Sequence, residues 1–363
     1  MANSQEYGLF QLLDLQQLNP NQLASTVDSG LLISAMEMDR AMHNQSIEAL
    51  SRLFSVTTSD YQLEVQQSGT SRNQPLDENG RAIPIKAPPP YTVAFPLQAS
   101  GTAWGANHVT RVQMTARDLA RTLAQMYRGD YIWVEDHILA HLFANASYTH
   151  RDPTGKGNLT IRGLANGDAV TYYNQTTQAL ATDSHYLFQA AGIADATNPY
   201  PTIAAELKEH PGNGGEVVAF ISTSLKATTQ ALTEFRSAQL DSDIQLASTV
   251  TRLVGSLNVT LPMGATVLGK TDSGVWVVEW PRLPAGYIVA IMTGGPRPLA
   301  RRVFPEAQLQ GFKPFGERPD FPYWEEQWQR WEGYGALNRV GAVAMLIGAG
   351  AYAVPTNYGV PMA

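Results

Sequence analysis

The chain contains no cysteine, and this absence removes several kinds of chemistry at once. Disulfide frameworks, zinc ribbons, iron–sulfur clusters and cysteine nucleophiles all need the thiol that the sequence lacks. The redox compartment stays undetermined. Whatever structure the chain forms must be held together without disulfide bonds.

The chain is also poor in charge. Asp, Glu, Lys and Arg make up 16% of its 363 residues, against roughly 25% in ordinary soluble domains. This deficit indicates that much of the surface meets other protein rather than water, although Gln, Asn, Ser and Thr partly fill the gap. The formal net charge of -7 argues against a dedicated nucleic-acid binder, because such proteins normally show a basic face.

Long apolar runs are missing as well. The closest approach to a membrane span is residues 340–354, which are too few and contain Gly341, Gly348 and Gly350. The first seven residues have neither a basic nor an apolar region, so no secretory signal is expected. A hydrophobic fraction of 44% is nevertheless enough for a core. At roughly 150 residues per domain, the length indicates two lobes or one fold with large extensions.

The N-terminal region is expected to be helical. Leucines recur at helix-like spacing over residues 9–15, and Asn19-Pro20-Asn21 then interrupts them. A second helix is expected over residues 30–54. This Gln- and Leu-rich start is either a core helix or an arm that packs on a neighbouring chain, and the sequence leaves both open.

Residues 56–113 are expected to form a long, two-stranded projecting arm. Residues 61–65 alternate in the manner of a strand, and the proline-rich residues 84–96 return. Between them, Asp77-Glu78-Asn79-Gly80 favours a tight turn. Proline cannot donate to a ladder, so these strands are restricted to an edge. Two strands alone are marginal in water, so such an arm needs a partner surface; the alternative is an ordinary long loop.

A long helix is expected from Thr115 to about residue 146. Thr115 is the predicted N-cap, with Asp118 three residues on in place of the usual Glu. Apolar residues continue from Leu119 at helical spacing, and Gly129 is a point where the helix could bend or break. Unbroken, about 30 residues at 1.5 Å each give a rod of about 45 Å. Such a rod is long for a globular core and natural for a spine.

The rest of the chain mixes strands and helices, which places it in the α+β class. The turn signal at residues 165–168 predicts a hairpin between residues 159–161 and 169–172. Further along, the apolar pattern predicts these elements: a helix at 203–209, a strand at 216–221, a helix at 224–236, strands at 267–269, 275–280 and 287–292, and a strand or strand pair within 340–354.

The best candidate for enzyme chemistry is a pair of histidines on the long helix. His137 and His141 are four residues apart, a spacing that allows both to bind one metal ion. The metalloprotease pattern needs Glu directly after the first histidine, where this chain has Ile138. A third ligand would come from His150 or Asp152. The alternative is a pair of surface or interface histidines.

Other motifs are weaker. Residues 152–157 superficially resemble a phosphate-binding loop, but the upstream glycine and the hydroxyl residue after Lys156 are missing, so a β-turn is expected. No nucleophile elbow or dinucleotide fingerprint occurs. We therefore predict no catalytic, cofactor-binding or metal-binding residues and no cofactor.

The segment 312–334 is dense in aromatic side chains, including Trp324, Trp328 and Trp331. Aromatic residues are enriched at the energetic centres of interfaces, and core packing is the alternative. Prolines 314, 319 and 322 argue against regular structure, which favours an extended interface strap.

The order of these parts resembles a major capsid protein of tailed bacteriophages with the Hong Kong 97-type fold. The likeness is carried by residues 274–292, with the strand Val275-Trp276-Val277-Val278-Glu279, and by residues 331–343, with Gly333-Tyr334-Gly335 and Asn338-Arg339. Capsid proteins of this kind often close with a similar glycine–aromatic, Asn-Arg and apolar-strand pattern. The organisation covers nearly the whole chain, but the motifs are short.

The resemblance implies a domain map. Its parts are an N-terminal arm at 1–55, an extended β-hairpin loop at 56–113, a peripheral domain with a long spine helix at 114–178, an axial domain at 179–300, and a return to the peripheral domain at 301–363.

It also implies a function: self-assembly into hexamers and pentamers of an icosahedral shell that encloses double-stranded DNA. Expected partners are the chain itself and separate scaffolding, portal and decoration proteins, with no membrane and no sequence-specific DNA contact. The expected location is the virion capsid, assembled in the host cytoplasm. The candidate contacts between subunits are Arg72, Asp77, Glu78, Arg81, Lys86, Tyr91, Trp324, Trp328 and Trp331.

Two further hypotheses stay open. An encapsulin-like compartment shell would share the fold and hold protein cargo, and a metal-dependent hydrolase would use His137 and His141. Some capsid proteins cross-link subunits through Lys and Asn. Lys86 is the only lysine of the expected loop, but no acceptor Asn can be matched, so a solvated lysine is the favoured interpretation.

Overall fold

The computed structural model describes Leu23 and residues 29–67, 75–76, 78–82, 88–238, 261–318 and 323–362. The chain divides into two compact units. Unit 1 consists of Met1–Ala49, Gln98–Asp136 and Val303–Glu332, and unit 2 of Leu50–Leu97, His137–Arg302 and Gly333–Ala363. None of the described helices combines the length and apolar character that a membrane span requires.

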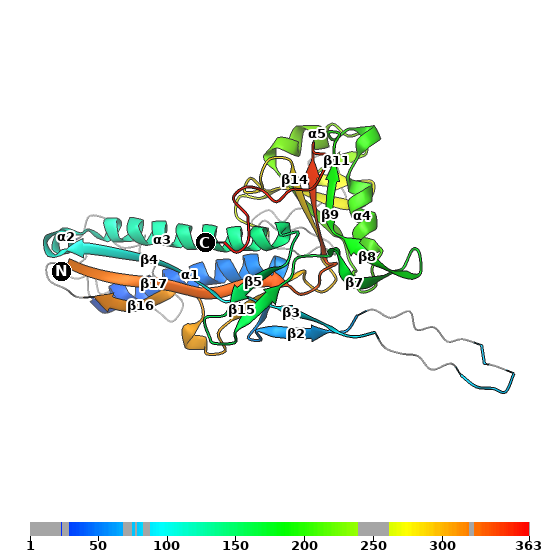
Figure 1. Cartoon of the computed structure of the whole chain (residues 1–363). Helices are drawn as coiled ribbons and strands as arrows, with labels where there is room; N and C mark the ends of the chain where they lie inside the picture. The colour runs from blue at the N-terminus through cyan, green and yellow to red at the C-terminus, as the bar shows by residue number, and fades with distance from the viewer. Residues whose placement is uncertain are drawn as a thin grey trace, which may run out of the picture. The chain divides into compact units, whose positions relative to one another are not determined.

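The elements follow one another as Figure 1 labels them. The helices are α1 (Ser29–Phe54), α2 (His108–Gln113), α3 (Ala116–Phe143), α4 (Tyr200–Lys208) and α5 (Lys226–Gln230), with 3-10 turns at Asp195–Thr197, Thr223–Leu225 and Ala307–Leu309. The strands are β1 (Ser55–Thr58), β2 (Gln62–Val65), β3 (Tyr91–Ala94), β4 (Gln98–Asn107), β5 (Tyr148–Arg151), β6 (Asn158–Ile161), β7 (Asn166–Asn174), β8 (Ala179–Ser184), β9 (Tyr186–Gln189), β10 (Val217–Ile221), β11 (Phe235–Ser237), β12 (Thr266–Thr271), β13 (Val275–Glu279), β14 (Tyr287–Met292), β15 (Leu299–Val303), β16 (Lys313–Arg318), β17 (Tyr323–Ala336) and β18 (Ala342–Ile347).

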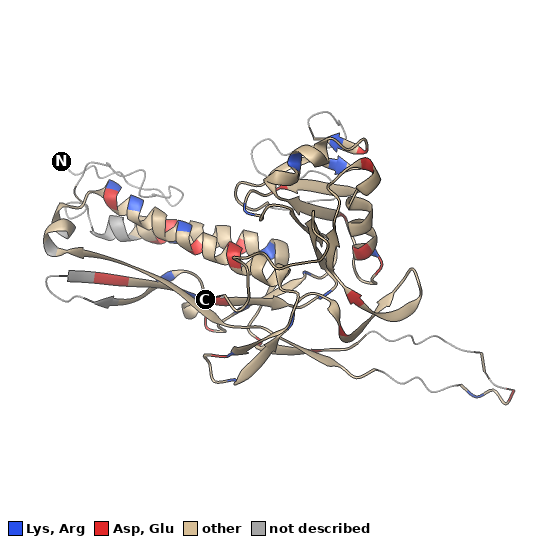
Figure 2. Ribbon diagram, turned by 45° about the horizontal axis from the view of Figure 1, so that its top comes forward, with Lys and Arg blue, Asp and Glu red and all other residues tan. Residues whose placement is uncertain are grey.

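The spine helix predicted from sequence is α3, and its start is the expected cap. The Thr115 hydroxyl donates to the Asp118 carboxylate at 2.7 Å, and the Asp118 N–H donates back to the Thr115 hydroxyl at 3.2 Å. Its 28 residues run unbroken through Gly129, a length of about 42 Å. Figure 2 shows both basic and acidic residues along it, while most of the ribbon is uncharged.

Unit 1 packs helical faces against a long strand. The strand β17, 14 residues long, pairs antiparallel with β16 on one side and with β4 on the other. The core between these elements contains Ala35 of α1, Leu119, Leu123 and Met126 of α3, Phe312, and Trp328 of β17. The expectation of irregular structure in this aromatic segment is therefore wrong for residues 313–318 and 323–336, which are strands, and its interface role stays a prediction. Pro314 is accommodated because β16 ends its sheet, where a missing N–H costs no ladder bond.

A buried ionic cluster joins three elements of unit 1. The Arg330 side chain, 0% exposed, donates from Nε and Nη2 to the Asp130 carboxylate at 2.8 and 2.7 Å. It also donates to Glu332 at 3.0 Å and to the Asn44 side-chain oxygen at 2.9 Å. His43 reaches Asp130 at 2.7 Å. The cluster therefore ties β17 to α3 and α1.

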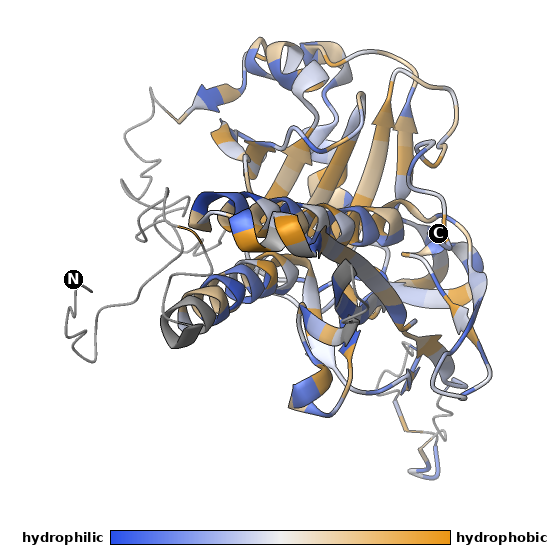
Figure 3. Cartoon of the chain, turned by 90° about the vertical axis from the view of Figure 1, so that its left-hand side faces the viewer, coloured by the Kyte–Doolittle hydropathy of each residue, from blue (hydrophilic) through white to orange (hydrophobic). Residues whose placement is uncertain are grey.

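Unit 2 is centred on a seven-stranded sheet of order β11-β12-β13-β10-β14-β18-β9. The residues of β10, β13 and β14 are all buried, as the continuous apolar runs of their sequences predict for strands covered on both faces. Figure 3 shows these strands in orange. Ile203 and Leu207 of α4 pack into the core on this sheet. These three strands and α4 confirm the sequence predictions.

Three two-stranded ladders, β2–β3, β5–β6 and β7–β8, belong to unit 2 as well. The predicted hairpin between 159–161 and 169–172 is wrong, because β6 pairs with β5 and β7 pairs with β8. Other turns decide the pairing. Gly155 and Gly157, at φ +80° and +83°, close the first ladder, and the Asn174 side chain accepts two N–H groups at the turn of the second.

The remaining helix predictions have different outcomes. The helix predicted at 224–236 is shorter, because residues 235–237 leave it to pair with β12 as β11. The helix predicted over residues 9–15 lies outside the described residues. The helix predicted at 30–54 is confirmed as α1.

The buried ionic cluster of unit 1 leads to a stability prediction. Replacing Arg330 with Met leaves two buried carboxylates without their cation, so the free energy of unfolding should fall by roughly 3–5 kcal/mol. Urea denaturation of the purified chain measures this loss.

Arg236→Met is the matched control. Arg236 pairs with Asp272 at 2.6 Å, but the two side chains are 62% and 51% exposed. An exposed pair contributes at most about 1 kcal/mol. Equal losses in the two variants would contradict the importance of the Arg330 cluster.

Candidate functional site

The histidines nominated by the sequence do not form a metal site. The His141 Nδ1–H donates to the His137 carbonyl at 2.7 Å, and its Nε2 accepts from the Tyr148 hydroxyl at 2.8 Å. Burial lowers the pKa of His141 to about 4, so the ring is neutral near neutral pH. Among the described residues, the groups able to share a metal ion do not include this pair.

The two proposed third ligands are engaged elsewhere. His150 Nε2 lies 3.2 Å from the Leu97 carbonyl. The Asp152 carboxylate binds the buried guanidinium of Arg302 at 3.0 Å. Burial alone would raise the pKa of Asp152, but the hydrogen bonds from Arg302 and Thr154 outweigh it and hold that pKa below its usual value. The side chains on which the hydrolase hypothesis relied are therefore engaged in other bonds within the subunit.

The sequence 152–157 forms the turn of the β5–β6 ladder, as predicted. The Asp152 N–H donates to the Gly157 carbonyl at 2.9 Å, and the Gly155 N–H donates to the Asp152 carbonyl at 3.3 Å. The Asp152 carboxylate at the start of this turn is bound to Arg302.

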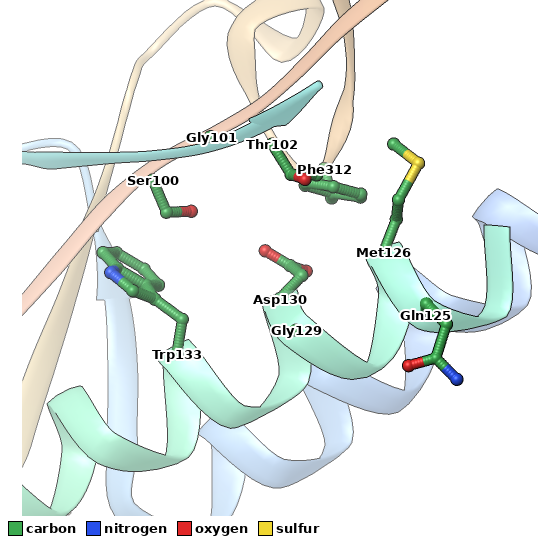
Figure 4. A pocket seen from close by; sticks show the side chains of 9 residues that line it. All are labelled: Ser100, Gly101, Thr102, Gln125, Met126, Gly129, Asp130, Trp133 and Phe312. Atoms are coloured by element: carbon green, nitrogen blue, oxygen red, sulfur yellow. The ribbon is translucent and has the colours of Figure 1, made fainter. Parts of the chain in front are cut away.

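A pocket of about 220 Å³ lies in unit 1 between α3 and β4 (Figure 4). Asp130, Trp133 and Ser100 point into it, and Phe312 closes one side. The Asp130 carboxylate is already shared by Arg330 and His43. The pocket therefore offers a packed ion pair rather than an acid and a base free to react.

A second cluster, in unit 2, was missed by the sequence reasoning. Asp183, His185 and His210 bring their side-chain nitrogen and oxygen atoms within 4.8 Å of one another, as do Asp183, Glu206 and Glu209. The available signals were two short patterns, Asp183-Ser184-His185 and the helix end Glu206-Leu207-Lys208-Glu209-His210. Neither is specific alone, because only the fold brings them together.

The electrostatics of this cluster are strongly coupled. Burial would raise the pKa of Asp183, but the hydrogen bonds from His185 and His210 hold it well below its usual range. Burial, together with the charges of Asp183 and Glu209, raises the pKa of Glu206 to about 8. Burial would lower the pKa of His210, but the hydrogen bond to Asp183 and the charge of Asp183 raise it.

The candidate contact residues lie in different parts of the chain. Arg72, Asp77 and Lys86 lie outside the described residues. Glu78 and Arg81 are exposed beside a turn that ends at Gly80, φ +75°, as the sequence predicted.

Tyr91 is half-buried in unit 2, with the Arg162 guanidinium 5.9 Å from its ring centroid. Burial raises the pKa of its hydroxyl. This side chain is therefore partly committed to packing inside its own unit.

The three tryptophans belong to β17 of unit 1. Trp328 is 2% exposed and packs on Phe312 at a centroid distance of 5.5 Å, so this candidate contact is a core residue of its own subunit. Trp331 is half-buried and donates to Gln329 at 3.1 Å. Trp324 lies opposite Ala106 of β4 in the ladder, and its side chain lies outside the described part of the chain.

Several other large apolar side chains are exposed. Among the described residues they include Leu23, Met42, Val56, Leu76, Val109, Val112, Phe188, Met263 and Phe315. Leu76 matters most here, because it is 60% exposed in the segment that connects β2 to β3.

Comparison with solved structures gives the fold. A structure described as Mycobacterium phage Patience matches over 99% of this chain and 99% of its own, at 18% identity and a TM-score of 0.68. The mature capsid of bacteriophage PhiM1 matches over 81% of this chain and 84% of its own, at 11% identity and a TM-score of 0.48. An encapsulin complex from Synechococcus elongatus matches over 84% and 89%, at 10% identity and a TM-score of 0.42.

No protein-family model and no curated protein matches the sequence. Of the three structures, the first spans both chains almost completely, and the fold assignment rests on it. The chain has the Hong Kong 97-type capsid fold, an α+β architecture with a spine helix and a β-hairpin between α1 and α3.

The buried His141 leads to a pH prediction. Its pKa is about 4 in the folded chain and about 6.5 when unfolded, so the unfolded state binds more protons between these values. The free energy of unfolding should therefore decrease as the pH falls from about 6.5 to about 4, by about 3 kcal/mol from this group.

His141→Gln keeps a hydrogen-bonding side chain that does not titrate, so its unfolding free energy should depend less on pH across this range. Denaturant unfolding at several pH values gives both slopes. Identical slopes for the His141→Gln variant and the wild type would refute the assignment.

Proposed function

We propose that this chain is the major capsid protein of a tailed bacteriophage. In this proposal, it assembles through hexamers and pentamers into an icosahedral shell around double-stranded DNA. The observation that carries the proposal is the whole-length likeness to a structure described as Mycobacterium phage Patience, at a TM-score of 0.68 over 99% of both chains.

The segment between β2 and β3 supports a role in assembly. At its base, Leu63 and Val65 of β2 pack with Val93 and Phe95 in the core of unit 2. Beyond this base, every described residue of 75–82 is exposed, including Leu76 at 60%. A neighbouring subunit would supply the surface that buries this segment.

The composition fits a surface shared with neighbours. Only 16% of the residues are charged, and the exposed apolar side chains are spread over several elements rather than gathered at one pocket. Closed symmetry repeats each modest contact many times, so many weak contacts can hold a shell. With no cysteine, such contacts must be packing, hydrogen bonds or a lysine cross-link.

The charge fits the proposed contents. A net charge of -7 is compatible with a shell whose inner surface does not bind the packaged DNA tightly, because tight phosphate binding needs Lys and Arg. The proposed role is structural and assigns no catalytic residue. Separate scaffolding, portal and decoration proteins are part of the proposal, as are the domain map and assembly in the host cytoplasm. For Lys86, a solvated side chain rather than a cross-link is proposed.

Expression of the chain followed by negative-stain electron microscopy should show uniform closed shells. Nucleic acid inside particles purified from their natural source supports the viral capsid, because a genome is the cargo of a virion. A protein cargo in its place would instead identify an encapsulin-like compartment. A dispersed monomer under all assembly conditions would contradict both.

Deletion of residues 69–82 tests the proposed contact between subunits. Loss of shells is expected, because the deletion removes surface that only a neighbour can bury. The subunit's thermal unfolding should change little, since the described residues 75–76 and 78–82 are exposed.

A variant with residues 69–82 replaced by Gly and Ser at equal length is the matched control. It keeps the reach of the segment but removes its side-chain contacts, so it should also assemble poorly. Normal shells from the deletion variant would rule out this segment as a clamp on neighbours.

A further inference from the structure

The Asp183 cluster of unit 2 is built from segments that are far apart in sequence. Asp183 lies near the end of β8, His185 sits between β8 and β9, and His210 follows α4. The two histidines are 0% and 2% exposed. Buried imidazoles need a partner for each ring nitrogen, or they lose the hydrogen bonds that water would give them.

A contact with a backbone carbonyl shows which nitrogen of each ring carries the proton. The Nδ1 atom of His185 lies 2.8 Å from the carbonyl oxygen of Ala342, and Nδ1 of His210 lies 3.3 Å from that of Tyr173. A carbonyl oxygen only accepts, so each Nδ1 must carry the proton and donate. In the neutral rings, both Nε2 atoms are then lone-pair acceptors.

These two lone pairs face each other and a carboxylate. The Nε2 atoms of His185 and His210 are 3.2 Å apart, and Asp183 Oδ2 lies 3.2 Å from the first and 2.7 Å from the second. Three acceptors at such distances repel unless a proton or a cation lies among them. Protonation of one ring lets its Nε2–H donate to Asp183, whereas one cation can satisfy all three atoms at once.

The spacing matches a small coordination sphere. Metal–nitrogen distances of about 2.0–2.1 Å in a tetrahedral site place neighbouring ligand atoms roughly 3.3 Å apart. The two 3.2 Å separations agree with this value, and the 2.7 Å separation would lengthen slightly. The Nδ1–H to carbonyl bonds are the arrangement that orients metal-binding histidines.

The carboxylates are also placed for this role. The Ser184 N–H donates to Oδ1 of Asp183 at 2.7 Å, which orients the group and leaves Oδ2 for the cluster. Glu209 Oε1 lies 3.6 Å from His210 Nε2, beside the three atoms but not grouped with them. Glu206 adds a further carboxylate beside Asp183 and Glu209.

We propose that Asp183, His185 and His210 bind one divalent transition-metal ion of the zinc type. Imidazole nitrogen favours Zn²⁺, Co²⁺ or Ni²⁺ over Mg²⁺ and Ca²⁺, which prefer all-oxygen sites. These three protein ligands leave the fourth position of a tetrahedral ion to Glu209, after a movement of its side chain, or to water. The ion would tie the end of α4 to the β8–β9 connection and, through Ala342, to β18.

The test is calorimetric titration of ZnCl₂ into the full chain, prepared without a histidine tag and freed of metal by a chelator. One ion per chain should bind, and it should raise the midpoint of thermal unfolding. Asp183→Asn and His210→Gln should weaken binding by at least about 100-fold, more than the loss of an outer-shell partner costs.

His141→Gln is the matched control, because it alters another buried histidine whose two nitrogens bond within the subunit. It should leave zinc binding unchanged. Absence of stoichiometric zinc binding, or unchanged binding in both ligand variants, would overturn the site.

Cobalt substitution covers the case in which the variants fail to fold. The wild-type chain with one equivalent of Co²⁺ should show the visible absorption of a four-coordinate ion, and one equivalent of Zn²⁺ should abolish it. A spectrum of hydrated, six-coordinate Co²⁺ would count against the proposal. Since the site lies within one subunit, its failure leaves the capsid proposal untouched, and failure to form shells leaves the metal site intact.

Discussion

The burial of Arg330 is the constraint on which unit 1 depends. A guanidinium with 0% exposure must have its donors filled, and Asp130, Glu332 and Asn44 fill them from three elements. Along β17, the alternate residues Trp328, Arg330 and Glu332 are all buried, so one face of the strand carries both the apolar core and the charge. A slip of one residue would turn Arg330 to the other face. The ion pair therefore selects the register of the strand.

The same arrangement recurs in unit 2. Arg302 binds Asp152, and Arg339 binds Asp168, each across a long stretch of sequence. Arg339 also donates to the Gly163 carbonyl at 2.8 Å and to the Leu164 carbonyl at 3.1 Å. Such pairs cost desolvation and are weak evidence of stability, but a broken one is expensive. In a chain without disulfides, they join distant segments and penalise wrong pairings.

The contacts of Arg339 explain the Asn338-Arg339 motif, which was one basis of the capsid resemblance. Arg339 binds the connection between β6 and β7. Asn338 donates to the Pro296 carbonyl at 3.1 Å. The motif thus reflects the closing of a fold rather than the chemistry of a site. This agrees with a subunit whose proposed work is to hold its shape while its extensions bind neighbours.

Local signals in the sequence determined a large part of the protein. The cap at Thr115 and the helical spacing after it predicted α3, and the continuous apolar runs predicted β10, β13 and β14, because these signals act within a few residues. Only the tertiary structure decided which strands pair around residues 148–184 and that Trp328 is a core residue. It alone brought His185 and His210 together. Each of these depends on partners more than ten residues away, and loops, turns and buried charges choose among them by contacts that no local pattern records.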